Sequence, residues 1–367
     1  MKSTARILLS GYYGFSNAGD EAVLSSIITG LKAQFGPAAD ITVFSGSCET
    51  TEKLHGVKAV SRSPLGINAA VGDCDLLISG GGSLIQDATS LKSLLYYLGV
   101  IWLARDCRVM VLGQGIGPLR RRISKILTRF VLNKVGMIAV RDRESAELLR
   151  QIGVTEPPIH VTADPTFILE PCSDEETESL LADSGIKPGE AVIAVSMRSW
   201  PGCPQIAEIT AEALEKLADN LNARILLVAM QSPDDFVVAR KIHQWCPDAA
   251  IQSKPWNPRQ VRGVLGQCSL VAGMRLHALV LASSAGVPCL GISYDPKVES
   301  FMNAANQPCI PLETLTADTL CSGLVDSWNN RDALASRLSE TIPDMKKSAM
   351  ENFRLAAQLL KRPQDER

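Results

Sequence analysis

The sequence predicts an α/β protein with two Rossmann-like domains, each built on a parallel sheet, followed by a C-terminal helix. Its 367 residues favour two domains over one. Hydrophobic residues make up 46% and charged residues 21%, a globular composition that can bury two sizeable cores. Short apolar runs alternate with amphipathic stretches along the chain, which is typical of parallel sheets covered by helices on both faces.

The first half of the chain shows this alternation clearly. Strands are expected at residues 6–10, 41–45, 76–79, 109–112 and 137–140. Helices are expected between them, at residues 21–35, 91–105, 123–134 and 145–152. Continuously apolar strands are buried on both faces, so this half predicts one parallel sheet.

A proline-rich segment then interrupts the pattern. Residues 157–188 contain five prolines and the acidic run SDEETES, which together mark a domain boundary. Within this segment, residues 173–184 are expected to form a short helix that Ser173 caps, with Glu176 three residues further on.

The alternation resumes after this boundary. Strands are expected at residues 191–196, 224–229, 249–252, 270–272 and 289–292. Helices are expected at residues 206–220, 234–245, 258–267, 277–285 and 342–361. We therefore predict an N-terminal domain at residues 1–170, a C-terminal domain at 171–340, and a terminal helix and tail at 341–367. Two such successive domains resemble the GT-B arrangement of glycosyltransferases.

Composition limits the classes of partner. A formal net charge of −2 gives no general attraction to nucleic acid, so an anion must be bound by a local patch. No stretch approaches the roughly eighteen apolar residues of a membrane-spanning helix. The ten cysteines are scattered without a CxxC pair, which indicates a reduced, cytoplasmic protein without a structural zinc ion.

Three glycine-rich loops each follow a predicted strand of the first half. They are GYYGFSNAGDEA at residues 11–22, SGGGSLIQD at 79–87 and GQGIGP at 113–118. Tight turns are the structural alternative, but ligands of open parallel sheets bind beyond the carboxyl ends of the strands, where glycine lets the backbone approach an anion. The expected ligand contacts in these loops are Asn17, Gly19, Gly81, Gly82, Gln114 and Gly115.

Two charged residues close to the predicted sheet edge are each open to two interpretations. Asn17 and Asp20 can cap the helix that follows, or Asp20 can act as a base facing the cleft between the domains. Arg141, at the end of its strand, can pair with Asp142 or Glu144, or it can bind a ligand. We favour ligand binding for Arg141 because carboxyl ends of strands are where such sheets bind ligands.

The segment GMRLHALVLASSAGVP, residues 273–288, contains the most informative histidine. His277 follows Arg275 at a predicted strand-to-helix turn. Both side chains reach one site only if Arg275 lies in the turn and His277 in the first helical turn. After the next strand, the loop SYDPKVESF adds a further cation, Lys297. The remaining histidines have no such supporting residues: His55, His160 and His243.

Taken in order, these segments resemble the polysaccharide pyruvyl transferases. The matching motifs are NAGDEA, SGGGSLIQD, GQGIGP, VRDRES, DPTF, MRLHALVLA and YDPK, and the resemblance covers residues 6–301. Length and motifs look most like the CsaB-type subgroup. The resemblance implies a GT-B-like fold and an enzyme that places a pyruvate ketal on N-acetylmannosamine of a lipid-linked cell-wall polysaccharide precursor, with phosphoenolpyruvate as donor.

The resemblance also implies roles for particular residues. Arg141, His277 and Lys297 match positions implicated in donor binding and catalysis, with Arg275 beside them. His277 is the candidate general acid, and Asp20 the candidate base for the acceptor hydroxyl. The donor is expected against the C-terminal domain with Arg141 reaching across, and the acceptor over the glycine loops. No metal or other cofactor is expected, since the cations neutralise the donor.

A basic amphipathic stretch at residues 120–134 has two interpretations. Its six cations surround apolar residues, so the helix can lie on an anionic bilayer as a peripheral contact at the inner face of the membrane. It can also be an ordinary covering helix with solvated cations, which is the commoner case.

Two other functions remain as alternatives. A GT-B glycosyltransferase that uses a nucleotide-sugar would share the fold, but the C-terminal domain shows no clear acidic residue for a ribose. A non-catalytic sugar- or anion-binding paralogue would keep the glycine loops as turns. A dinucleotide oxidoreductase is disfavoured because the GxGxxG fingerprint is absent.

Overall fold

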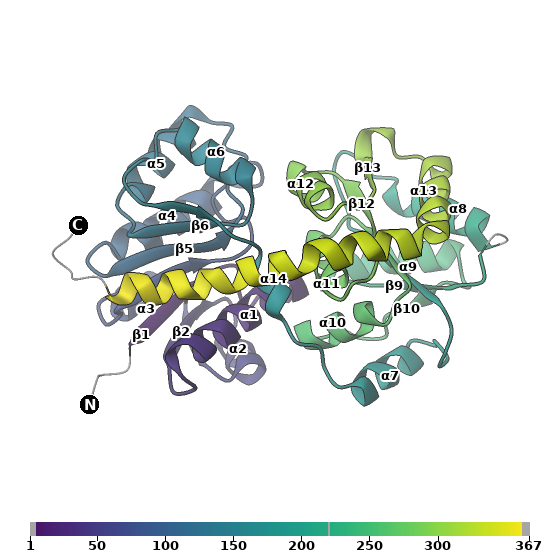
Figure 1. The fold of residues 1–367 in the computed structure, drawn as a ribbon, viewed down its shortest axis with the longest axis horizontal. Helices are drawn as coiled ribbons and strands as arrows, with labels where there is room; N and C mark the ends of the chain where they lie inside the picture. Colours follow the sequence, from purple (N-terminus) through teal and green to yellow (C-terminus); the bar gives the residue numbers. More distant parts are fainter. Residues whose placement is uncertain (1–4, 219–220, 362–367) are drawn as a thin grey trace. The chain divides into compact units, whose positions relative to one another are not determined.

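The structure is a computed structural model that describes residues 5–218 and 221–361. The chain forms two compact units (Figure 1). The N-terminal unit comprises Met1–Ser16, Asp20–Ile168 and Met345–Arg367, and the C-terminal unit comprises Asn17–Gly19 and Leu169–Asp344. The short segment Asn17–Gly19 therefore belongs to the C-terminal unit although it lies near the start of the chain.

The N-terminal unit is built on a seven-stranded sheet in which every pairing is parallel, with the order β3-β2-β1-β4-β5-β6-β7. Its strands are β1 (Arg6–Ser10), β2 (Asp40–Ser45), β3 (Lys58–Ser61), β4 (Leu76–Gly80), β5 (Arg108–Gln114), β6 (Met137–Val140) and β7 (Ile159–Val161). Its helices are α1 (Ala18–Phe35), α2 (Cys48–His55), α3 (Pro64–Val71), α4 (Leu91–Leu103), α5 (Arg122–Leu132) and α6 (Arg143–Gln151).

Both faces of this sheet are buried. Leu8 and Leu77 pack into one apolar cluster, whereas their chain neighbours Leu9 and Ile78 pack into another on the opposite face. Phe353, from the end of the long helix α14 (Arg331–Lys361), completes the second cluster. The continuously apolar strands of the sequence therefore form the doubly covered sheet that they predict.

The C-terminal unit has a six-stranded sheet, again with only parallel pairings, in the order β10-β9-β8-β11-β12-β13. Its strands are β8 (Val192–Ser196), β9 (Arg224–Leu227), β10 (Ala250–Ile251), β11 (Leu270–Gly273), β12 (Cys289–Ser293) and β13 (Cys309–Pro311). Its helices are α7 (Asp174–Asp183), α8 (Ile206–Ala218), α9 (Asp234–Trp245), α10 (Pro258–Gly266), α11 (Leu276–Ser284), α12 (Pro296–Ala304) and α13 (Ala317–Asn329). A short 3₁₀ helix at Leu312–Thr314 belongs to this unit, and another at Pro165–Ile168 belongs to the N-terminal unit.

The predicted fold class, two Rossmann-like α/β domains with a C-terminal helix, is confirmed. Ser173 caps α7 as expected, since its hydroxyl accepts the N–H of Glu176. The terminal helix α14 begins well before the predicted start, because Pro343 inside the helix interrupts the pattern on which the prediction depends. The predicted helix at 206–220 ends at residues outside the described part of the chain. No helix within the described ranges is long and apolar enough to cross a membrane.

Candidate functional site

The three glycine-rich loops follow β1, β4 and β5, which are direct neighbours in the sheet of the N-terminal unit. Because these strands are parallel, their carboxyl ends lie at one edge of the sheet. The strand β6 is the next in order, and it brings Arg141 to the same edge. The loops and the arginine expected to contact ligand are therefore neighbours in space.

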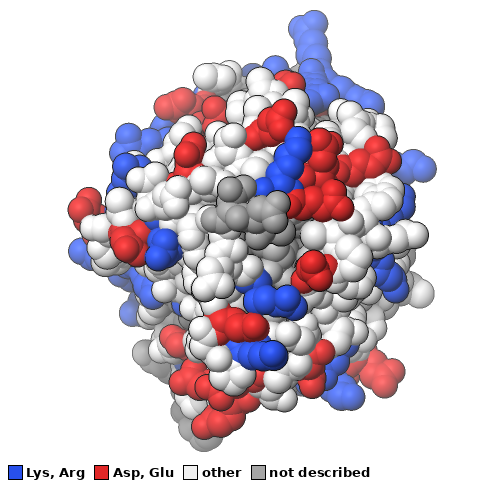
Figure 2. Space-filling view, turned by 90° about the vertical axis from the view of Figure 1, so that its right-hand side faces the viewer, with Lys and Arg blue, Asp and Glu red and all other residues white. Residues whose placement is uncertain are grey.

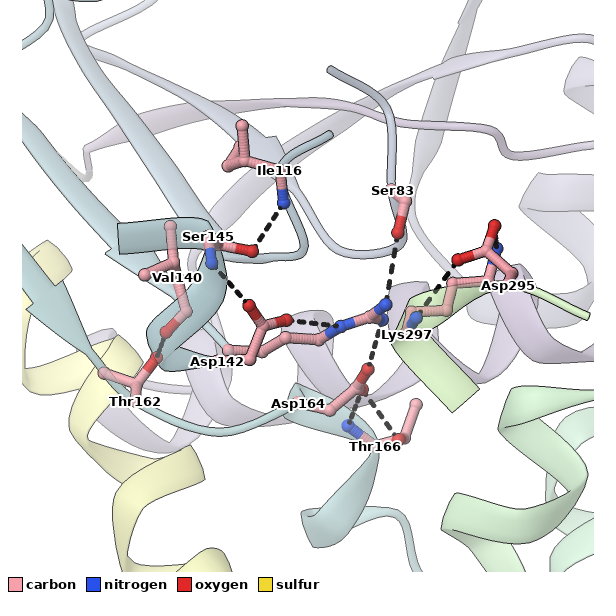
Figure 3. A network of polar contacts seen from close by, with 11 residues as sticks. Ser83, Ile116, Val140, Asp142, Ser145, Thr162, Asp164, Thr166, Asp295 and Lys297 are labelled. Carbon is pink, nitrogen blue, oxygen red and sulfur yellow. Dashed lines mark hydrogen bonds and ion pairs between the residues drawn. The ribbon is translucent and has the colours of Figure 1, made fainter. Parts of the chain in front are cut away.

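Arg141 is held in a network of polar side chains, and Figure 3 labels its partners Ser83, Asp142 and Asp164. Its guanidinium donates to Asp164 Oδ2 at 3.0 Å and to Ser83 Oγ at 3.1 Å. Asp142 is a weaker partner at 3.7 Å, and its carboxylate mainly caps α6 by accepting the N–H of Ser145. The main ionic partner of Arg141 is therefore Asp164 of the DPTF motif, rather than the adjacent carboxylates that the sequence suggested.

Two neighbouring residues of the GQGIGP loop have different roles. A Cβ atom on Gly115 would lie 2.9 Å from Nη2 of Arg141 and 3.0 Å from Oγ of Ser83, so only glycine leaves room for this network. Gln114 is fully buried, and its amide donates to Ser79 Oγ at 2.8 Å. The side chain of Gln114 thus links β5 to β4 inside the sheet.

Asp20 lies over the triple-glycine turn. A Cβ on Gly82 would come within 3.2 Å of Oδ1 of Asp20. Gly81 and Gly82 have φ of +70° and +65°, so this turn requires the left-handed backbone that glycine adopts without strain.

The next acidic residue, Glu21, secures the first loop. Its carboxylate accepts the N–H of Gly14 at 2.7 Å and contacts Nε2 of His55 at 2.8 Å. The interpretation of His55 as a histidine without supporting residues is therefore wrong, because its partner lies far away in the sequence.

Asp87, at the end of the second loop, connects that loop to the start of α5. Its carboxylate accepts the N–H groups of Arg120 at 2.7 Å and Arg121 at 2.8 Å. Burial alone would raise the pKa of Asp87, but these hydrogen bonds outweigh it and hold the pKa below the ordinary value.

Asp87→Ala should destabilise the protein by about 2 kcal/mol at pH 7, because two charge-assisted hydrogen bonds are lost. A lowered folded-state pKa stabilises the protein above the unfolded-state pKa, and this contribution disappears as the pH falls through the folded-state value. The difference from wild type should therefore shrink below about pH 4 in urea unfolding. An equal difference at pH 7 and pH 3, after correction with the exposed control Asp248→Ala, would contradict this.

In the C-terminal unit, Arg275 lies in the turn before α11 and His277 in its first turn, which is the arrangement the sequence required. The guanidinium of Arg275, however, forms a two-pronged ion pair with Asp235, at 2.8 Å and 2.6 Å. A further hydrogen bond of 3.0 Å joins it to Oε1 of Gln231. Asp235 is only 1% exposed, so this is a buried pair.

The same carboxylate also positions a backbone segment. Oδ2 of Asp235 accepts the N–H groups of Met230 and Gln231, at 3.1 Å and 3.0 Å. Met230 in turn accepts the N–H of Ala18 at 2.7 Å, and Gln231 forms an antiparallel bridge with Asn17. Arg275 and Asp235 therefore hold residues 230–231 in place, and the segment Asn17–Gly19 is paired with these two residues.

The segment Asn17–Gly19 ends against His277, the candidate general acid. A Cβ atom on Gly19 would lie 2.5 Å from Nδ1 of His277, so the ring packs directly on the glycine backbone. The side chain of Asn17 accepts the N–H of Gly19 at 3.0 Å, as a helix-capping asparagine does. Asn17 and Gly19 thus shape the surroundings of His277, and Asp20 is the next residue of the chain.

A second cationic cluster follows β8 and β12, the strands on either side of β11. Arg198 donates to the hydroxyl of Tyr294 at 3.2 Å, and the ring of Tyr294 lies 4.6 Å from that of Trp200. Nζ of Lys297 is 5.7 Å from the Tyr294 ring centroid and 3.5 Å from Asp295. Arg198, His277 and Lys297 therefore follow three adjacent parallel strands.

Arg198 was missed by sequence reasoning. The usable signal was its place two residues after a buried strand, at the edge where the sheet binds ligands. Across residues 5–218 and 221–361, no group of three or more His, Cys, Asp or Glu side chains is arranged to hold a metal ion.

Comparison with known proteins identifies relatives of this chain. Residues 17–296 match the family model of polysaccharide pyruvyl transferases. The amylovoran biosynthesis protein AmsJ of Erwinia amylovora is 21% identical over 251 residues, which cover 64% of this chain and 60% of AmsJ. The alignment thus spans less than two thirds of that relative.

Several solved structures share the fold. The S. aureus MnaA structure with UDP has a TM-score of 0.71 at 12% identity. The match covers 99% of this chain and 100% of MnaA. Anabaena HepE in complex with UDP and glucose has a TM-score of 0.64 at 16% identity, covering 97% of this chain and 99% of HepE. At these identities the likeness establishes the fold alone. The family model, in contrast, covers most of the chain, including Arg141 and His277, so the chain belongs to the polysaccharide pyruvyl transferase family.

Proposed function

We propose that this enzyme transfers the pyruvyl group of phosphoenolpyruvate to two hydroxyls of one sugar, forming a ketal and releasing phosphate. The observation that carries the proposal is the placement of Arg198, His277 and Lys297 after three adjacent parallel strands of the C-terminal unit. This edge combines two cations with one acid–base group, which suits a small donor that carries two anionic groups.

The cations divide between binding and positioning. Phosphoenolpyruvate carries a carboxylate and a phosphate on neighbouring atoms, and the planar guanidinium fork matches either group. Arg198 and Lys297 are both partly exposed, so we assign donor binding to them. Both prongs of the Arg275 guanidinium are bound by Asp235. We therefore assign Arg275 a positioning role, through the segment Asn17–Gly19 that contacts His277.

The chemistry follows from this arrangement. His277 donates a proton to the methylene carbon, which leaves an oxocarbenium-like centre at C2. A sugar hydroxyl forms a bond to C2 and gives its proton to Asp20, and phosphate departs with the electron pair of its C2–O bond. A second hydroxyl then attacks C2 and closes the ketal. The two hydroxyl protons balance the proton added to carbon and the proton taken up by phosphate.

The acceptor is proposed to bind at the carboxyl edge of the N-terminal unit, over the glycine loops. The first loop also offers an aromatic surface, since Tyr12 and Phe15 stack with ring centroids 4.4 Å apart. Arg62 lies 4.1 Å from the centroid of Tyr96 beside them. Aromatic faces of this kind combine an apolar body with polar edges, as a sugar ring requires. Following the CsaB-type resemblance, the acceptor sugar is N-acetylmannosamine on a lipid-linked cell-wall precursor.

Gly115→Ala should reduce turnover by about a hundredfold, because the added methyl displaces the guanidinium of Arg141 from the sheet edge. Thermal stability should change much less than activity. The matched control is Gly99→Ala on α4, where an added Cβ meets no atom within 4 Å. If steady-state kinetics gave the same turnover for Gly115→Ala and Gly99→Ala, the assignment of Arg141 to the active site would be wrong.

A direct product assay tests the proposed reaction. The enzyme is incubated with phosphoenolpyruvate and a lipid-diphosphate saccharide ending in N-acetylmannosamine, and phosphate and product mass are measured. We expect phosphate in equal amount to a product heavier by one pyruvate less one water. The competing function is transfer from a nucleotide-sugar, which the UDP complexes of MnaA and HepE suggest for their fold. Turnover of UDP-N-acetylglucosamine without any use of phosphoenolpyruvate would favour that function.

A further inference from the structure

Helix α5 exposes a stripe of apolar residues to the solvent, although Val131 and Leu132 of the same helix are buried in the core. Ile123, Ile126 and Phe130 are 50%, 52% and 54% exposed, and their spacing places them on one stripe of the helix. The hydroxyl residues Ser124 and Thr128 are fully buried on the other side. An ordinary covering helix buries its apolar stripe against its own domain. Helix α5 does cover its own domain through Val131 and Leu132, so the covering-helix interpretation accounts for its buried side but not for the exposed apolar stripe.

The end of α4 extends the same apolar surface. The ring of Trp102 lies 5.0 Å from the ring of Phe130, and the adjacent Leu103 is 43% exposed. Tryptophan with phenylalanine on an exposed surface is typical of the boundary between a bilayer and water. We call this surface, together with the cations around it, the α5 patch.

The charge of the α5 patch has one sign. Residues 119–134 contain no acidic residue and six exposed cations: Arg120, Arg121, Arg122, Lys125, Arg129 and Lys134. On the face drawn in Figure 2, by contrast, Lys and Arg are interspersed with Asp and Glu. Clusters of four to eight Lys and Arg on an amphipathic helix are typical of binding to anionic lipids.

A hollow of about 1080 Å³ opens beside Trp102 and Phe130. Its lining includes four cations against two acids: Arg105, Arg108, Arg129 and Lys134, with Asp106 and Glu156. A cavity of this size and charge excess is suited to an anionic headgroup next to the apolar stripe.

We propose that the α5 patch docks the protein on an anionic phospholipid bilayer. Three features agree on this occupant: the exposed apolar stripe, the cations that flank it and the cationic hollow next to it. The inference does not depend on the proposed reaction. It would, however, bring a lipid-linked acceptor close to the glycine loops, because Asp87 joins the start of α5 to the second loop.

The test is vesicle flotation of the full chain without donor or acceptor. Wild type should float with phosphatidylcholine vesicles that contain phosphatidylglycerol, should be released by high salt, and should not float with phosphatidylcholine alone. Replacing three cations should weaken binding by about a hundredfold or more. The charge variant is R121Q/R122Q/K125Q, and the apolar variant is I126S/F130S.

Control variants make comparable changes of charge and apolar area elsewhere on the surface. They are K53Q/K346Q/K347Q for charge and Leu65→Ser, at an 84% exposed leucine on α3, for apolar area. Both controls should float as wild type does, and all variants should unfold at the wild-type temperature. Binding that ignores lipid charge, or that survives both patch variants, would overturn the proposal. So would a wild-type dimer in sedimentation velocity that Phe130→Ser dissociates, because a second copy would then cover the patch.

Discussion

His277→Gln is expected to lower the rate of pyruvyl transfer by about a thousandfold, because it removes the proton donor and leaves the fold intact. The ring packs against the backbone of Gly19, and glutamine has a similar length and hydrogen-bonding ability. Binding of phosphoenolpyruvate should change much less than turnover, since the cations Arg198 and Lys297 remain. Pre-steady-state phosphate release with saturating donor measures the loss directly.

The matched control is His160→Gln. His160 is a partly exposed histidine on β7, an edge strand of the sheet in the N-terminal unit. It should retain wild-type turnover. If His277→Gln also retained full turnover with normal stability, protonation of the methylene carbon would have to come from another group, and the assignment would be wrong.

Arg275→Ala is expected to destabilise the C-terminal unit by about 3 kcal/mol, because it leaves Asp235 charged and buried without its partner. Asp235→Ala should cost a similar amount. The double variant should be more stable than the sum of the two single changes predicts, since each single change strands a partner that the double change removes. Urea unfolding of the four proteins completes this cycle.

Kinetics distinguish positioning from donor binding. If Arg275 acts through Gln231 and the segment Asn17–Gly19, its loss should reduce kcat, and the KM for phosphoenolpyruvate should change little. Arg198→Gln should show the opposite split, with a raised KM. An Arg275→Ala variant of normal stability whose only defect is a raised KM would contradict the positioning role and return Arg275 to the donor site.

The fold was largely predictable because its determinants are local. Buried parallel strands read as continuous apolar runs, and most lie within one or two residues of the predicted bounds. The short edge strands β3, β7 and β13 were not predicted, because each spans only three or four residues and is partly exposed. Helices α2, α3, α12 and α13 were also not predicted.

The candidate site was predictable only in part, because sequence shows positions and not partners. The turn that holds Arg275 and His277 follows from Gly273 and the flanking apolar runs. The pairing of Arg275 with Asp235 does not, since Asp235 lies in the first turn of α9, forty residues earlier in the chain. The same limit applies to α5, where the sequence predicts an amphipathic helix but cannot tell which side faces the solvent.

The most direct test of the central claim is a thermal-shift titration with phosphoenolpyruvate beside UDP-N-acetylglucosamine, on wild type and Arg198→Gln. A ligand at a hundred times its Kd stabilises the native state by about 2.7 kcal/mol, which corresponds to a rise in Tm of about 5 °C. The account predicts this rise for wild type with phosphoenolpyruvate, its loss in Arg198→Gln and no rise with the UDP-sugar. A clear rise with the UDP-sugar and none with phosphoenolpyruvate would contradict it.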